Sequence, residues 1–234
     1  MGIRFVSRYG HGTRQFAAVT TVIGVMLALG VGTAALATAG PHVVPAGGKV
    51  AGTGYAYWLA REWQLQFANT PPYKACQTMT VNGRKVGYLG IKSIAPATTS
   101  YACSEHAGRP LYVIELSAEC STFHGDHLTF GTTDAQLTKC ARIEFRQGTP
   151  TQATTIDGHA VDVSKLIATT SVYRVHNAKG NFVTSANPSG RSAACGWGIL
   201  LTGLAKGRHV IHSVAKITQP VSAKWVYTWT VTVH

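Results

Sequence analysis

The chain has 234 residues, of which 21 are Lys or Arg and nine are Asp or Glu, so its formal net charge is +12. Such a surplus favours anionic partners, and because no nucleic-acid-binding motif is present, we expect no nucleic-acid partner. The sequence also lacks the Gly-x-Ser-x-Gly, His-Glu-x-x-His, P-loop and Gly-x-Gly-x-x-Gly patterns. It therefore indicates none of the enzyme classes with those signatures, and no cofactor is predicted.

Residues 16–39 carry no charge and follow three arginines. A basic start, an apolar middle and a small-x-small end at Ala37-Thr38-Ala39 are typical of an export signal. We therefore predict that residues 1–39 are an export signal that is cleaved after Ala39, and that the protein is secreted. Because about 20 apolar residues can also span a bilayer, a membrane anchor over residues 16–39 is the alternative.

Beyond the export segment, residues 40–53 are rich in Gly, Ala, Pro and Val, and we predict a flexible spacer. Residues 54–234 contain no further linker-like stretch and no internal repeat, so a single domain is expected there. Its basic residues are scattered along the sequence. Solubility is therefore the competing explanation of the charge, beside a dedicated anion-binding patch.

A helix is predicted over residues 55–69, which contain no Gly, no Pro and no β-branched residue. Thr53 is the expected N-cap, and two prolines follow the helix. We expect its aromatic and apolar side chains to pack on a sheet, with an aromatic ligand platform as the alternative. These side chains are Trp58, Leu59, Trp63 and Phe67.

Short β-branched and aromatic segments separated by turn signals predict strands along the rest of the chain. They cover residues 86–91, 99–103, 111–116, 161–166, 172–175, 181–184, 198–201, 209–214 and 225–233. Two hairpins are expected, 172–175 with 181–184 and 198–201 with 209–214. A second short helix is predicted over 132–145, capped by Thr132 or Thr133. This pattern indicates a mainly β fold: an antiparallel β-sandwich with one N-terminal helix and one further short helix.

Five cysteines occur, and no two of them form a Cys-x-x-Cys motif. Outside the cytoplasm cysteines tend to pair, and an odd count leaves one unpaired. The sequence alone allows several connectivities. We predict that nearest neighbours pair, Cys76 with Cys103 and Cys120 with Cys140, because each bridge would link a helix-proximal segment to a strand-proximal one. Cys195 would then remain a free, buried thiol.

The densest polar cluster follows the third predicted strand and contains Glu115, Glu119, Cys120, His124, Asp126 and His127. The spacing of His124 and His127, with Asp126 between them, suits a zinc or other transition-metal ion. However, the segment is Gly-containing and has the character of a loop. We therefore expect it to be solvent-exposed and metal-free, with these three residues as the candidate ligands if a metal binds.

Paired carboxylates for glycoside hydrolysis are a second possible site, if acids that are distant in sequence meet in space. The candidates are Glu105, Glu115, Glu119, Asp126, Asp134 and Glu144. An enzyme would be favoured if the fold gathered three or more of these side chains in one concave pocket: Glu115, Glu119, His124, Asp126 and His127.

Two later segments carry a family resemblance. Residues 155–161 contain Asp-Gly followed by Val, and residues 204–211 match a Leu-x-Pro-Gly-x-His-x-Ile turn and strand in which Lys206 replaces the proline. With Cys76 and Cys103 in corresponding places, the chain over roughly residues 55–234 resembles a group of bacterial exported proteins of unassigned function. The resemblance implies export and a similar fold, and it implies no activity.

The sequence therefore predicts an exported, disulfide-stabilised globular protein. We expect a non-enzymatic binding or interaction module at the cell envelope, whose partner is an anionic envelope polymer or lipid headgroups. The alternative is an envelope-polymer hydrolase, either metal-dependent through His124 and His127 or based on the acidic residues. No catalytic residue is assigned, and the sequence does not indicate an oligomeric state.

Overall fold

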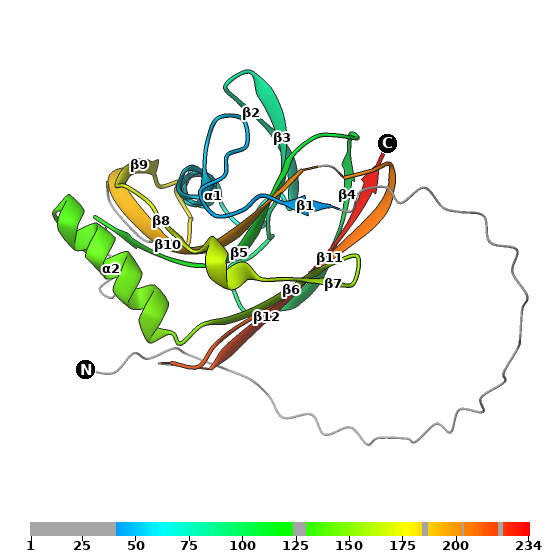
Figure 1. Cartoon of the computed structure of the whole chain (residues 1–234). Coiled ribbons are helices and arrows are strands. Elements are labelled where there is room, and N and C mark those ends of the chain that lie inside the picture. Colours follow the sequence, from blue (N-terminus) through cyan, green and yellow to red (C-terminus); the bar gives the residue numbers. More distant parts are fainter. Residues whose placement is uncertain (1–40, 124–129, 184–186, 203, 220–221) are drawn as a thin grey trace, which may run out of the picture. The chain divides into compact units, whose positions relative to one another are not determined.

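The computed structural model describes residues 41–123, 130–183, 187–202, 204–219 and 222–234 (Figure 1). These residues form twelve strands, two α-helices and a 3-10 helix. In chain order the elements are β1 (His42–Val43), α1 (Tyr55–Ala68), β2 (Cys76–Val81), β3 (Arg84–Leu89), β4 (Thr98–Glu105), β5 (Leu111–Ser121), α2 (Asp134–Gln147), β6 (Thr151–Ile156), β7 (His159–Val161), η1 (Val163–Leu166), β8 (Ala168–Thr169), β9 (Tyr173–His176), β10 (Ser189–Thr202), β11 (Gly207–Ile217) and β12 (Ala223–Val233).

The strands form two sheets, which confirms the mainly β prediction. The first has the order β1-β10-β5-β3-β2, with β8 and β9 also paired to β10, and the second has the order β4-β12-β11-β6-β7. The antiparallel arrangement predicted from the sequence is wrong in part, because β3 pairs with β5 and β4 pairs with β12 in parallel. Between β3 and β5 the chain runs through β4 in the other sheet, so β5 returns in the direction of β3.

The long antiparallel pair of β5 and β10 is covered on both faces where it carries small residues. Successive side chains of a strand point to opposite faces. Ala194 accordingly packs in an apolar cluster with α1, whereas Ala193 and Cys195 pack in a separate cluster with α2. Because these side chains are small, both helices can lie close to the sheet.

Farther along the same pair, larger apolar residues form the main core. Leu111 and Val113 of β5 and Ile199 of β10 belong to one cluster with Ile211 and Trp229 of the second sheet. All five are completely or almost completely buried. The two sheets therefore share one hydrophobic core, and α1 closes its other side through Trp58, which stacks on Tyr112.

Helix α1 buries the predicted side chains Trp58, Leu59, Trp63 and Phe67. Its N-cap is Gly54 rather than Thr53, and it has no side-chain cap. The Thr53 hydroxyl instead donates to the Val50 carbonyl at 2.9 Å, closing the turn that precedes the helix.

Helix α2 does have a capping box: Thr133 accepts from the Gln136 amide, and the Gln136 side chain accepts from the Thr133 amide. Thr133 is one of the two caps predicted from the sequence. A capping box of this kind satisfies backbone donors at the helix start.

The two predicted hairpins are wrong. Strand β9 pairs with β10, and residues 181–183 form bends while residue 184 lies outside the described residues. The Asn181 amide donates to the carbonyls of Gln66, Phe67 and Asn69, so this segment satisfies the C-terminal end of α1 instead of extending a sheet. Strands β10 and β11 lie in different sheets, because both edges of β10 are already paired.

Two further segments differ from their predictions. The strand expected over 161–166 ends at Val161 and continues as η1, whose Asp162 side chain accepts from the Ser164 amide. The stretch expected to be a flexible spacer packs on the domain: β1 pairs with β10, and Val44, Val50 and Ala51 are buried in the main core. Apolar burial thus outweighs the turn-forming composition of this stretch.

The structure contains both predicted disulfides and leaves Cys195 as a buried free thiol. Cys76–Cys103 joins β2 of the first sheet to β4 of the second. Cys120–Cys140 fastens α2 to β5. Disulfides persist in oxidising environments, so the protein belongs to an oxidising or extracellular compartment. No helix within the described ranges is long and apolar enough to cross a membrane, and the segment predicted to be an export signal lies outside those ranges.

Replacing Trp58 by Ala should lower the free energy of unfolding by about 3–5 kcal/mol, because this side chain of α1 is fully buried and stacks on Tyr112. The neighbouring Tyr57→Ala substitution is the control. Tyr57 is 43% exposed, and it should lose about 1 kcal/mol or less. Urea denaturation of both variants measures the difference, and equal losses would contradict the packing described here.

Peptide mapping without reduction should recover fragments joined through Cys76–Cys103 and Cys120–Cys140. Removing the first bridge by the double substitution Cys76→Ala and Cys103→Ala should lower the free energy of unfolding by about 3 kcal/mol, because the bridge closes a loop of 27 residues. Chemical denaturation under non-reducing conditions measures the loss. A recovered fragment bridged through Cys195 would refute the pairing.

Candidate functional site

The candidate metal ligands His124, Asp126 and His127 lie outside the described residues. Within the part of the chain that is described, no group of three or more His, Cys, Asp or Glu side chains could hold a metal ion. The metal hypothesis therefore stays a prediction.

The acids Glu115 and Glu119 both belong to β5 but bind groups in different layers. Glu115 accepts hydrogen bonds from Thr154 at 3.1 Å, from Ser213 at 2.5 Å and from Gln152, all in the second sheet. Glu119 accepts from Ser192 at 2.6 Å, on the face of β10 that α1 covers. The structure does not gather them in one concave pocket.

Two other candidate carboxylates form ion pairs with arginines. Glu105 is buried and lies 2.7 Å from Arg109, and Asp134 pairs with Arg191 at the start of α2. Asp126 lies outside the described residues. Glu144 lies on α2.

A buried carboxyl group that was not predicted from the sequence lies on the side of α1 that faces β5. Glu62 is only 1% exposed and accepts hydrogen bonds from Tyr112 at 2.8 Å and from Ser117 at 3.1 Å. Trp63 completes the network by donating to the Ser117 hydroxyl. Gly198 is needed here, because a Cβ at that position would lie 2.5 Å from the Tyr112 ring.

Burial dominates the electrostatics of this network. It raises the pKa of Glu62 to about 8, against the lowering effect of the two hydroxyl donors and with a smaller contribution from the charge of Glu115. Burial also raises the pKa of Glu115 to about 7, against its three hydrogen bonds. Glu62 is sealed from solvent, and its hydrogen bonds join α1 to β5.

His209 and Asp157, which lie in the two segments that carry the family resemblance, are in contact. The Asp157 carboxylate lies 2.7 Å from His209 Nδ1 and accepts from the Val210 amide at 2.8 Å. His209 Nε2 faces the Ala205 carbonyl at 2.9 Å. Desolvation lowers the His209 pKa, but the bonds to Asp157 and Ala205 outweigh it, so the pKa is raised overall. The pair ties the β6–β7 turn to the start of β11.

The surface of the described domain is far more basic than its composition indicates. Seventeen of the eighteen Lys and Arg residues after position 40 are exposed, and Arg109 is half-buried. Four of the nine acids are buried: Glu62, Glu105, Glu115 and Glu119. The positive charges are thus displayed to solvent while nearly half of the negative charges are withdrawn.

A shallow groove of about 640 Å³ lies along α2 and concentrates part of this charge. Its lining residues are Asp134, Ala135, Thr138, Lys139, Arg142, Ile143, Arg146, Ser171 and Val172. The three cations follow one another at spacings of three and four residues, which places them on one face of a helix.

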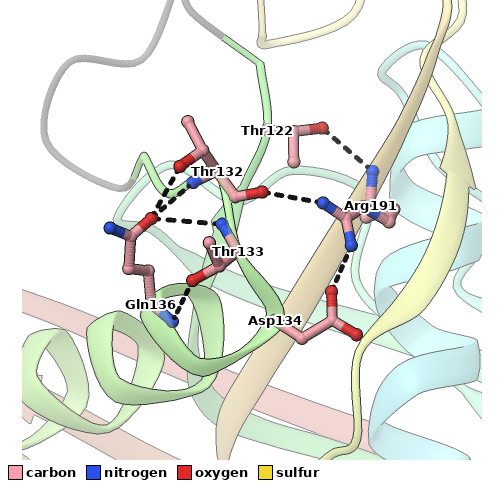
Figure 2. Close-up of polar contacts among 6 residues, drawn as sticks. All are labelled: Thr122, Thr132, Thr133, Asp134, Gln136 and Arg191. Carbon is pink, nitrogen blue, oxygen red and sulfur yellow. Dashed lines mark hydrogen bonds and ion pairs between the residues drawn. The ribbon is translucent and has the colours of Figure 1, made fainter.

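The N-terminal end of this groove is held in place by Arg191 of β10. Figure 2 shows its guanidinium between the Asp134 carboxylate and the Thr132 carbonyl, to which Arg191 Nη2 donates at 2.8 Å. Its backbone amide donates to the Thr122 hydroxyl at 3.0 Å. Gln136 closes the capping box beside these contacts. The helix start is therefore fastened to β10.

The sequence analysis treated the basic residues as scattered and so missed this face. The signal was present in the helix predicted over 132–145, where Lys139 and Arg142 are three residues apart and Arg146 follows four residues later. Applying the helical period to the charges as well as to the apolar residues would have grouped them. The opposing wall, Ser171 and Val172, could not have been assigned without the tertiary structure.

Comparisons with known proteins identify no family for this chain. No family model and no curated protein matches it. Among solved structures, a protein whose structure is titled "Solution Structure of Amebosin" is 14% identical over 58% of this chain and 89% of its own, with a TM-score of 0.20.

The stability of the domain should fall as the pH rises from about 4.5 to 8. Over that range the unfolded state ionises Glu62 and Glu115 while the folded state retains their protons. Between the unfolded and the folded pKa of each group, the free energy of unfolding therefore falls by up to about 1.4 kcal/mol for each pH unit. The raised pKa of His209 acts in the same direction, because its contribution is complete below the unfolded value and is lost as the pH passes the folded one.

Urea denaturation at a series of pH values between about 5 and about 9 measures this dependence. Glu62→Gln keeps the shape and hydrogen-bonding capacity of the side chain but cannot ionise, so its profile should be flatter than that of the wild type. A wild-type profile that rises over the interval would contradict the assignment of Glu62 and Glu115 as protonated, buried groups.

Proposed function

We propose that this protein is an exported, non-enzymatic binding module that holds an anionic component of the cell envelope. The disulfide-stabilised domain supplies a rigid scaffold, and its exposed Lys and Arg side chains supply the contacts. Acidic polymers and lipid headgroups both have the required chemistry, since both present phosphate or carboxylate groups to solvent.

The observation that carries this proposal is the segregation of charge between core and surface. Four of the eight acids in the described residues are buried. Three others, Asp134, Asp157 and Asp162, pair with basic side chains. The exposed cations therefore greatly outnumber the acids that could neutralise them. A field of one sign attracts anionic partners and accelerates their association.

The buried acids also support a binding role over a catalytic one. Glu62, Glu115 and Glu119 each accept hydrogen bonds from hydroxyl groups inside the domain, and Glu105 is paired with Arg109. A general acid or base must lie within hydrogen-bonding reach of its substrate. These four side chains are occupied in holding the layers of the fold together.

Co-sedimentation of the protein with insoluble cell-wall particles tests the proposal. We expect binding at about 50 mM NaCl that weakens at least about tenfold by about 500 mM, because salt screens and competes with contacts between exposed charges. Particles whose phosphate and carboxylate groups have been removed or amidated are the control and should bind little. The supernatant should contain no newly released sugar fragments.

Two results would overturn this function. Binding that is insensitive to salt and to removal of the anionic groups would show that charge is not the basis of recognition. Release of soluble fragments from the particles, abolished by His124→Ala and His127→Ala or by removing a bound metal, would establish the hydrolase instead.

A further inference from the structure

Among the exposed cations, those of α2 are distinguished by their arrangement. Lys139, Arg142 and Arg146 line one groove and cover two turns of the helix, a rise of about 10 Å from first to last. Within the described residues none of them takes part in an ion pair. The one acid that lines the groove, Asp134, is paired with Arg191 at its end. The groove itself is therefore strongly positive.

The groove is also held in a defined shape. The Cys120–Cys140 disulfide fixes the middle of α2 to β5, and Arg191 fixes its start. Arg142 Nε donates to the Thr169 hydroxyl of β8 at 3.3 Å, which joins this side chain to a neighbouring strand. A preorganised site loses less conformational freedom when it binds, so its charges contribute more to affinity than equally exposed but mobile ones.

We infer that this groove is the binding site of the protein for a linear polyanion, a chain with phosphate or carboxylate groups at regular intervals. The inference rests on the proposed function and adds a location and a ligand class to it. Lys139, Arg142 and Arg146 would bind successive anionic groups, and the guanidinium groups suit phosphate and carboxylate because they offer paired donors.

The line of cations along the groove favours a polymer over a lipid surface. A chain can follow this line and also contact Ser171 and Val172 on the opposite side of the groove. The groove also contains apolar side chains between the cations: Ile143, which is 38% exposed, and Val172 on the opposite wall. Uncharged parts of a polymer backbone can pack on these side chains while its anionic groups contact the cations.

The test uses protein purified from cells that express the full chain and measures its affinity for long-chain inorganic polyphosphate and for polygalacturonate over a series of salt concentrations. The groove variant combines Lys139→Gln, Arg142→Gln and Arg146→Gln. The matched control removes one lysine and two arginines that are equally exposed and lie outside the groove, by Arg84→Gln, Lys85→Gln and Arg208→Gln. Unchanged circular dichroism spectra and melting temperatures establish that both variants are folded.

The groove variant should lose at least about tenfold in affinity, and the slope of log affinity against log salt should fall by about two, as expected for three lost contacts to a flexible polyanion. The control should lose less than about threefold, since it alters only the general field. Phosphatidylglycerol vesicles, tested in parallel, should bind more weakly than the polymers and should not distinguish the two variants.

Each other outcome has a distinct meaning. Equal losses in the two variants would overturn the groove as the site and leave the proposed function intact. Vesicle binding that is stronger than polymer binding and depends on the groove would overturn the polymer as the ligand. If the wild type bound neither the polymers nor the vesicles, the proposed function itself would fail.

Discussion

The structure depends on the pairing of β5 with β10, which runs from Ser121 opposite Ser192 to Leu111 opposite Leu201. Every other layer packs on this pair or is joined to it by hydrogen bonds. Because both faces of the pair are covered, successive side chains along each strand pack alternately against the layer on one face and the layer on the other. Where the residues are small, helices pack on both sides, and where they are large, the second sheet and α1 enclose the core.

The same pair explains how the domain tolerates several buried acids. Acids of β5 accept hydrogen bonds from hydroxyl groups of neighbouring strands: Glu115 from the second sheet, and Glu119 from β10 of its own sheet. Glu62 of α1 is in turn held by Tyr112 and Ser117 of β5. Burying a carboxyl group is costly unless its hydrogen-bonding capacity is satisfied, and these donors, together with retained protons, reduce that cost.

Burying these acids has a consequence for the surface, since each carboxylate withdrawn into the core leaves the remaining exposed charge more positive. The fold and the proposed anion binding are therefore linked through the same residues. The α2 groove adds rigidity to this charge, because a disulfide and Arg191 connect its helix directly to β5 and β10. The scaffold thus positions the cations with the same pair of strands that organises the core.

Features that depend on neighbours along the chain could be predicted from the sequence. The apolar stripe of α1, Thr133 as one of two candidate caps of α2, most strand positions and the β-rich class all follow from local periodicity and turn residues. The disulfide pairs were also predicted, by pairing each cysteine with its nearest neighbour so that a helix-proximal segment is linked to a strand-proximal one. These properties require little information about what lies opposite each element.

Which elements meet could not be predicted from local patterns. Hairpins predicted from turn signals failed at Asn181, where side-chain bonds to the end of α1 took precedence, and after β10, whose edges were already paired. The hydrogen-bond partners of Glu62 lie 50 or more residues away in the chain. The groove wall opposite Arg142 lies about 30 residues away. Such contacts are set by the packing of whole layers, which no local pattern of residues encodes.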